Sequence, residues 1–416
     1  MELGRRLREV RDKSGDSLRK VESRSGLNNG YLSQLENGKI THPSPSVLEK
    51  VARGYELRFE DLLRWTGYVS GPEDPVTPNQ AVAFSTVSAL GDPSDEELRA
   101  LKAIVEVLRK SRPMFAAPSD MRMDDEAIAS IRAYVRALLR EADALGRRPT
   151  PLDDIEAAAR LVRAGELSLD PRDRARLVER FGHWVNLAWK RLQGACDYRA
   201  SAIWVAPDLH AMKHRFVVSH EIGHAILPAH KQTFAYVDDF TRLPPIARDL
   251  YEREANQAAI EILLQGGQAT DEFDSSPPSL DEICSISQSF GASVVATTRY
   301  AVETTKRAVA VAIAHVNAQR GLGPTHIYAS RRFDATFGWQ SGATPWNEVR
   351  AALRTAQTRD DESWVVKNLR GEPRIARVQK MSTGYATIVL VIPESRMQTV
   401  TRKLGPVGSR AIALAK

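Results

Sequence analysis

The chain has 416 residues, more than one ordinary hydrophobic core accommodates, so we expect about two to four domains. Its hydrophobic content of 43% and charged content of 26% are those of globular proteins, and its net charge of +6 allows an acidic partner such as DNA without requiring one. Two cysteines exclude a disulfide framework, the N-terminus lacks an apolar signal-peptide core, and no run reaches about 18 apolar residues, so we expect a cytoplasmic protein without a membrane span.

Residues 1–68 carry apolar side chains at helical spacings, which predicts a compact set of short helices. Within residues 17–38, one short helix ends near Gly26, a turn follows, and a second helix begins with Asn28 as its N-cap, which is the pattern of a helix-turn-helix. Asparagine and glutamine side chains can pair with adenine in the major groove, and groups after the helix can hold phosphate. The residues that suit these roles are Asn29, Ser33 and Gln34 for bases, and Asn37 and Lys39 for phosphate.

A small helical bundle that binds another protein is the alternative for residues 1–68. Their 13 Lys and Arg residues and 10 Asp and Glu residues give a net charge of +3, which does not separate the two functions. Glu22 stands where a small residue usually packs the two helices together. We favour DNA binding because the glycine-containing turn and the polar helix face occur together.

The rest of the chain predicts a linker and two further domains. Residues 69–123 read as a linker, because prolines and glycines are frequent at 70–95, with one helix at about 95–111. Residues 124–304 combine amphipathic helices with a strand at 201–206, which predicts a mainly helical α+β domain. Residues 305–416 are rich in β-branched and aromatic segments, which predicts another α+β domain. The expected fold class is therefore multidomain, with an all-α head.

The strongest chemical signal is the run His220-Glu221-Ile222-Gly223-His224. A helix places residues i and i+4 on one face, so His220 and His224 can direct two imidazoles at one zinc ion. Glu221 is rotated by about 100° from His220, where it can accept a proton from an attacking water. Apolar residues on both sides of the run predict a buried helix, in which histidines without a partner would be costly.

A catalytic zinc site needs a third protein ligand and keeps its fourth position for water. We expect Glu254, because it lies on a small, apolar helix face where a carboxylate would be stranded unless it met a cation. Glu252 projects elsewhere and is the weaker candidate. Three residues near in sequence are conceivable oxyanion donors, but nothing places them in the site and we expect surface or structural roles for them: His214, His230 and Tyr251.

Residues 1–68 resemble the helix-turn-helix of Xre or lambda/Cro-type repressors. The most specific part is the run SQLENGK at 33–39, with Pro43 beyond it. The resemblance implies a base-reading surface that includes Gly30. The full set of candidate DNA-binding residues is Asn28, Asn29, Gly30, Ser33, Gln34, Asn37 and Lys39.

Residues from about 124 to 303 resemble the ImmA/IrrE metallopeptidase family. The matching pieces are Arg215-Phe216 before the histidine motif, the run EREAN at 252–256, and FGAS at 290–293 with Arg299. The resemblance implies a zincin-like domain with zinc ligands His220, His224 and Glu254 and a catalytic Glu221. Members of this family cleave transcriptional repressors and thereby switch on stress responses or mobile elements. Some carry a C-terminal sensor-like domain, so residues 305–416 are expected to be GAF-like.

Three functions are compatible with these features. The leading one is a regulator that binds operator DNA through residues 1–68 and uses Zn²⁺ to hydrolyse a protein, most reasonably a repressor. The second is a transcription factor without proteolytic activity, whose peptidase-like domain senses zinc, a peptide or a metabolite; Glu221 argues against it, because a structural site needs no base. The third is an autoproteolytic regulator that cuts its own linker near 70–95. A homodimer is compatible with each.

Overall fold

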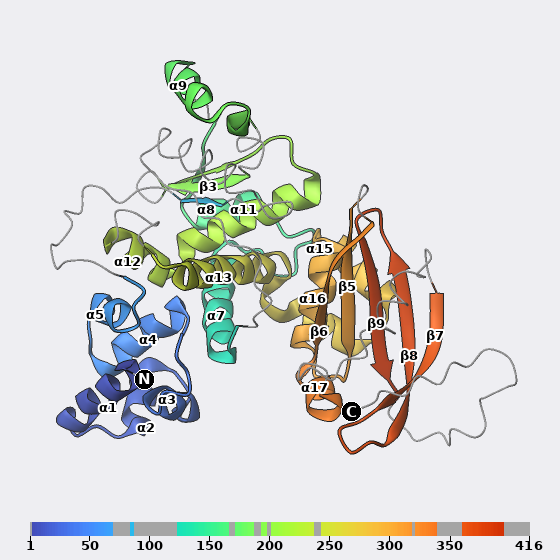
Figure 1. Cartoon of the computed structure of the whole chain (residues 1–416), viewed down its shortest axis with the longest axis horizontal. Coiled ribbons are helices and arrows are strands. Elements are labelled where there is room, and N and C mark those ends of the chain that lie inside the picture. Colours follow the sequence, from blue (N-terminus) through green and yellow to red (C-terminus); the bar gives the residue numbers. More distant parts are fainter. Residues whose placement is uncertain are drawn as a thin grey trace, which may run out of the picture. The chain divides into compact units, whose positions relative to one another are not determined.

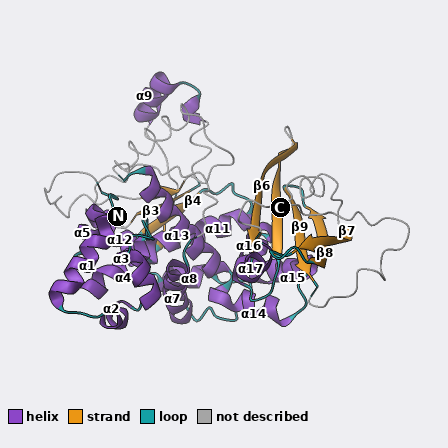
Figure 2. Ribbon diagram, turned by 60° about the horizontal axis from the view of Figure 1, so that its bottom comes forward, coloured by secondary structure: helices purple, strands orange, loops and turns teal. Residues whose placement is uncertain are grey.

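The computed structural model describes residues 2–69, 84–86, 123–165, 171–186, 193–197, 201–236, 243–317, 321–338 and 360–394. The chain divides into two compact units, Met1–Gly266 and Gly267–Lys416 (Figure 1). It is multidomain and mainly helical, as predicted; the described residues form two sheets, and the larger one lies in the second unit (Figure 2). The helix expected at 95–111 lies outside the described residues. In the parts that are described, no helix has the length and apolar character needed to cross a membrane.

The first unit opens with a head of five short helices. The turn between the second and third is defined by caps: Gly26 ends one helix with a φ of 69°, and the Asn28 side chain accepts a hydrogen bond from the N–H of Gly30 at 2.7 Å. The predicted helix-turn-helix with Asn28 as N-cap is thus present. The helices are α1 (Glu2–Ser14), α2 (Leu18–Ser25), α3 (Asn29–Glu36), α4 (Pro45–Tyr55) and α5 (Phe59–Trp65).

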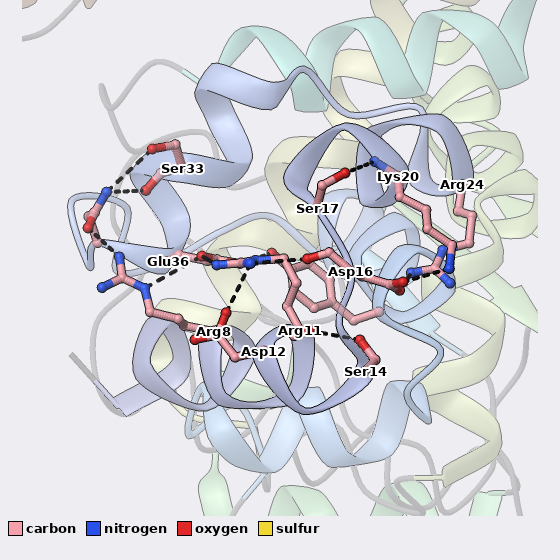
Figure 3. Close-up of polar contacts among 12 residues, drawn as sticks. Arg8, Arg11, Asp12, Ser14, Asp16, Ser17, Lys20, Arg24, Ser33 and Glu36 are labelled. Atoms are coloured by element: carbon pink, nitrogen blue, oxygen red, sulfur yellow. Dashed lines mark hydrogen bonds and ion pairs between the residues drawn. The ribbon is translucent and has the colours of Figure 1, made fainter.

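A buried carboxylate holds the third helix in place. Arg11 of α1 donates two hydrogen bonds to Glu36 of α3, at 2.7 and 2.9 Å, and the hydroxyl of Tyr55 in α4 donates a third at 2.8 Å. Figure 3 shows the Arg11–Glu36 pair, with Arg24 bonded to Asp16 beside it. A buried charge is tolerated only when it is paired and hydrogen-bonded in this way. The network therefore fixes α3 against α1 and α4.

The remainder of the first unit packs helices on a small sheet. Among its described residues the strand order is β1-β3-β4-β2; β2 and β4 run parallel, and the other two pairs are antiparallel. The strands are β1 (Phe84–Thr86), β2 (Val162–Arg163), β3 (Gly194–Asp197) and β4 (Ala202–Val205). The helices are α7 (Asp125–Glu141), α8 (Leu152–Ala158), α9 (Pro171–Phe181), α11 (Ala211–Ile226), α12 (Pro228–Tyr236) and α13 (Pro245–Leu263).

Helix α11 lies between the sheet and α13 (Figure 1). Gly223 makes the close approach of α13 possible, since a Cβ there would come within 2.9 Å of the Cβ of Ala258 and 3.0 Å of the carbonyl oxygen of Ala255. Side chains of both helices are almost entirely buried at this contact. The motif helix and the helix carrying Glu252 and Glu254 therefore pack side by side.

The second unit is a five-stranded antiparallel sheet with helices. Its strand order is β6-β5-β9-β8-β7, and Phe333 and Phe337 pack on one face against small residues such as Ala310 and Ala312. The strands are β5 (Ala310–Asn317), β6 (Gly321–Ala329), β7 (Asp360–Lys367), β8 (Pro373–Ser382) and β9 (Ala386–Pro393). The helices are the 3-10 turn Gln265–Gly267 at the junction, α14 (Gln268–Ser275), α15 (Leu280–Phe290), α16 (Val294–Thr304) and α17 (Arg331–Phe337).

The division between the units differs from the expected domain boundary at 304/305. Helix α15 contacts β8, and α16 contacts β5 and β6, so these helices form one compact body with the sheet. The helical pattern of 279–303 could not reveal this, because an amphipathic stripe does not say whether a helix or a sheet covers it.

Candidate functional site

Two histidines and a glutamate converge between α11 and α13. The Nε2 atoms of His220 and His224 lie 3.0 Å apart, and the carboxylate of Glu252 lies 3.5 Å from the first and 3.3 Å from the second. All three side chains are buried, and their ligand atoms lie within 4.8 Å of one another. Within the described part of the chain, this is the one group of His, Cys, Asp and Glu residues with such an arrangement.

The separations fit a zinc ion. Bonds of about 2.0–2.1 Å from zinc to nitrogen and oxygen, arranged tetrahedrally, place neighbouring ligand atoms about 3.3 Å apart. The three separations are close to that value: 3.0 Å between the two imidazole nitrogens, 3.5 Å from His220 to Oε2 of Glu252, and 3.3 Å from His224 to Oε1. Two imidazole nitrogens facing each other at 3.0 Å cannot both present bare lone pairs: either one carries a proton that it donates to the other, or both bind one cation. The residues therefore suit a tetrahedral zinc with one open position.

Hydrogen bonds at the other ring nitrogen orient both histidines. The Nδ1 atom of His220 lies 2.9 Å from Oδ1 of Asn256, and Nδ1 of His224 lies 3.0 Å from Nδ1 of His230. Because an amide oxygen only accepts, His220 carries its proton on Nδ1 and directs the Nε2 lone pair at the cluster. Such partners fix the tautomer of a metal-binding histidine and raise its basicity.

Glu254 faces away from this cluster. Its carboxylate accepts the backbone N–H and the hydroxyl of Ser46, each at 2.8 Å, and Nε2 of His230 lies 3.1 Å from it. The structure thus brings Glu252, not the expected Glu254, to the two histidines. Two residues correspond to about 200° of helix rotation, so the two carboxylates leave α13 on nearly opposite sides. The buried carboxylate of Glu254 is satisfied by its hydrogen bonds with Ser46 and His230.

Glu221 is completely buried and is not one of the three residues whose ligand atoms converge. Its carboxylate rests on strand β3, because a Cβ on Gly194 would come within 2.4 Å of Oε1. Only glycine leaves that space free. The side chain is therefore held next to His220 by a surface that the sheet provides.

Burial sets the charge states of the cluster. It lowers the pKa of His220 to about 4 and holds the pKa of His224 well below its usual value, so both imidazoles are neutral at pH 7 and available as ligands. Burial also raises the pKa of Glu252 to about 7, against the opposing effect of His220. A bound cation would favour the carboxylate form of Glu252.

The three residues considered as oxyanion donors have other surroundings. The hydroxyl of Tyr251 is hydrogen-bonded to Thr233, and its ring packs on His230 with centroids 4.9 Å apart. His214 lines a cavity of about 410 Å³ with Arg215, and none of the clustered ligands lines it. The sequence did not predict the contact between His230 and His224, because nothing in the local sequence of His230 marks it as a partner of a histidine.

The residues expected to contact DNA lie along α3 and the turn that follows it. Five of these residues are exposed, namely Asn28, Gly30, Gln34, Asn37 and Lys39, and two are partly exposed, Asn29 and Ser33. Asn37 donates to the carbonyl of Ser33 at 2.8 Å and accepts from Arg8 at 2.5 Å; Figure 3 shows both Arg8 and Ser33.

Glu22 is also accommodated in the head. It accepts the backbone N–H of Asn29 at 3.1 Å, so it caps the first turn of α3 instead of disturbing the packing. The helix that would meet DNA is therefore held at both of its ends.

Comparison with known families agrees with this description. Residues 2–65 match the family described as a helix-turn-helix domain, and residues 178–299 match the IrrE N-terminal-like domain. Both resemblances drawn from the sequence are confirmed. The second match includes every residue of the histidine–glutamate cluster.

Similar proteins are transcriptional regulators. The HTH-type transcriptional repressor RghR of Bacillus subtilis (strain 168) is 27% identical over 76 residues, which are 18% of this chain and 56% of the relative. The HTH-type transcriptional regulator SlrR of the same organism is 35% identical over 60 residues, 14% of this chain and 40% of the relative. The chain thus spans about half the length of the curated relatives it matches. A solved structure described as a Mycobacterium tuberculosis transcriptional regulator covers 72% of this chain and 82% of its own, at 12% identity and a TM-score of 0.41.

Proposed function

Because the chain joins a helix-turn-helix domain to an IrrE N-terminal-like domain, we propose that it is a DNA-binding transcriptional regulator with zinc-dependent endopeptidase activity. The observation that carries the proposal is the set of His220, His224 and Glu252, whose spacing suits zinc, on a helix in which the adjacent Glu221 is also buried. A purely structural zinc site would be closed by a fourth protein ligand and would need no adjacent carboxylate.

Each residue has a distinct task in peptide hydrolysis. His220, His224 and Glu252 hold the metal, and Asn256 and His230 orient the histidines. When bound, zinc lowers the pKa of a water molecule to about 7 and polarises the scissile carbonyl. Glu221 takes a proton from the attacking water and passes it to the leaving amine. The surrounding burial keeps other water away from these groups.

The proposed substrate is a transcriptional repressor, which the resemblance to the ImmA/IrrE family supports. Cleavage would relieve repression in a stress or mobile-element response, inside the cell where the operator DNA lies. Repressors encoded beside this gene are the first to test. They would be incubated with the zinc-loaded protein and examined by mass spectrometry for new termini; intact repressors throughout would count against this choice of substrate.

Zinc binding at pH 6 is expected to release about one proton. The sign follows from the pKa values: at pH 6 Glu252, with a pKa of about 7, is mostly protonated, whereas His220, with a pKa of about 4, is neutral. Zinc requires the carboxylate, so the proton leaves, and affinity rises with pH until Glu252 is ionised. Calorimetric titrations at pH 6 in buffers of different ionisation enthalpy give the proton number; a value near zero would contradict the assignment of Glu252.

The head is proposed to bind operator DNA through α3. The Gln34→Ala variant should weaken binding to duplexes selected from a random pool by about tenfold to a hundredfold, since a bidentate contact to a base is worth about 1–3 kcal/mol. The exposed Gln288 of the second unit offers a matched control, Gln288→Ala. Fluorescence anisotropy at fixed salt measures both. Equal affinities of wild type and Gln34→Ala for every selected duplex would remove Gln34 from the reading surface.

We further propose that residues 305–416, which carry the sheet of the second unit, form a GAF-like sensory domain. The five-stranded antiparallel sheet with packed helices supports this choice, together with the sensor-like domains of some family members. Its signal would then regulate the peptidase.

One observation favours autoproteolysis as a second candidate. Strand β1, from the predicted linker, pairs antiparallel with β3, so that Thr86 lies opposite Gly194, the residue on which the Glu221 carboxylate rests. Added strands are a common way to present a peptide to a protein. Mass spectrometry of zinc-loaded wild type and Glu221→Gln protein tests this directly. Cleavage within 70–95 in the wild type alone would support it, and an intact wild-type linker would dismiss it.

A further inference from the structure

A chain of buried hydrogen bonds runs from the candidate metal centre to the head. His224 meets His230 at 3.0 Å, His230 meets Glu254 at 3.1 Å, and Glu254 meets Ser46 of α4 at 2.8 Å through both the backbone and the hydroxyl. Each of these side chains is at most 1% exposed. The side chains are bonded to one another directly and are shielded from solvent.

The proton positions along this series of hydrogen bonds follow from the tautomer that His224 needs as a metal ligand. His224 must keep the lone pair of Nε2 for a metal, so its Nδ1–H donates to Nδ1 of His230. His230 then carries its own proton on Nε2 and donates it to Glu254. Glu254 receives this donor and the two donors of Ser46, which suits an acceptor-only carboxylate.

The hydrogen-bond series ends at Glu254, which caps helix α4 of the head. Ser44, the N-cap residue of α4, does not cap with its own side chain, and Pro45 has no N–H to offer. Ser46 supplies the first free N–H of this eleven-residue helix, and Glu254 accepts it. A carboxylate at a helix N-terminus is stabilising, and here it comes from another domain of the same compact unit.

We propose that His230 and Glu254 are positioning residues that couple metal binding at His224 to the docking of the head through Ser46. The proposal rests on the proposed zinc site. With zinc bound, His224 is held in one tautomer and every bond of the chain is made. Without zinc, the His224 ring can exchange tautomers, and the donor and acceptor roles along the hydrogen-bond series are no longer fixed. Zinc should therefore strengthen docking, and docking should strengthen zinc binding by the same factor.

A substitution in the head should accordingly change zinc affinity. The Ser46→Ala variant removes one donor to Glu254 and touches no ligand; we expect it to bind zinc about threefold to tenfold more weakly. Glu254→Gln should weaken zinc binding about tenfold to a hundredfold, as loss of a partner behind a ligand does. Tyr134→Phe is the matched control, because it removes a different contact with the head, the bond from Tyr134 to Glu49 at 3.2 Å. The variant keeps the bonds between Ser46, Glu254 and His230, which hold the head docked, so its zinc affinity should equal that of the wild type.

The experiment combines zinc titration against a chromophoric chelator with hydrogen exchange of the full chain, with and without zinc. In the wild type and Tyr134→Phe, zinc should slow exchange at the start of α4 at least about fivefold. In Glu254→Gln this protection should be lost. Zinc binding without any protection of α4, or Ser46→Ala and Glu254→Gln behaving like Tyr134→Phe, would overturn the coupling. Absence of zinc binding in the wild type would instead overturn the proposed function.

Discussion

The Glu221→Gln variant is expected to lose peptide hydrolysis by a factor of about 10²–10⁴, the usual contribution of a general base. Glutamine has the same shape and fills the same buried space above Gly194, so the fold should persist. It cannot accept a proton from water. Because Glu221 is not among the ligand atoms, zinc should remain bound. Cleavage rates of a repressor substrate and zinc content per chain, measured on the same preparation, give both quantities.

A matched control separates catalysis from general damage. Glu179, on α9, is exposed and distant in sequence from the motif, so Glu179→Gln should cleave at the wild-type rate. If Glu221→Gln cleaved as fast as Glu179→Gln, Glu221 would not be the base. If it lost zinc as well as activity, its role would be structural.

The second large expected effect is the loss of zinc affinity when the third protein ligand is removed. Structural zinc sites bind with about 10–16 kcal/mol shared among four ligands, so loss of one ligand should cost roughly a hundredfold to a thousandfold in affinity. We expect that loss for Glu252→Gln, because its carboxylate lies 3.3 and 3.5 Å from the two histidine nitrogens. Glu254→Gln should lose less, since Glu254 acts only through His230. Burial raises the pKa of both Glu252 and Glu254 to about 7, so competition with a chromophoric chelator at pH 7.5 or above compares the two carboxyl groups when both are largely ionised.

One result of comparing the zinc affinities of Glu252→Gln and Glu254→Gln would contradict the assignment of Glu252. If Glu254→Gln lost more affinity than Glu252→Gln, the sequence-based assignment would be right and the packing of α13 described above would not be that of the metal-bound protein. The absorption spectrum of the Co²⁺-substituted variants adds a second readout, because only removal of a ligand should change the coordination that it reports.

The parts of the site that depend on local spacing could be predicted from the sequence. His220 and His224 are four residues apart on one helix, and no tertiary information is needed to bring their side chains together. The same holds for the turn at Gly26 and the cap at Asn28, which are decided by backbone conformation and a side chain two residues away.

The third ligand depended on tertiary packing. Helix α13 is buried on two sides, one against α11 and the other against α4, so an apolar surrounding did not identify the side that holds the metal. A signal was nevertheless present: Glu252 and Asn256 are four residues apart and share a face, which suits a ligand beside an amide that orients a histidine. His230 carried no such signal, because its position relative to His224 is set by the short α11–α12 connection.

The most direct test of the metal centre is a crystal structure of the zinc-loaded protein with anomalous diffraction at the zinc edge. We expect one peak between α11 and α13, bonded to Nε2 of His220, Nε2 of His224 and a carboxylate oxygen of Glu252 at about 2.0–2.2 Å. Glu221 should lie next to the open position without a bond to the metal. A peak bonded to Glu254 instead, or no peak between the two helices, would contradict the account.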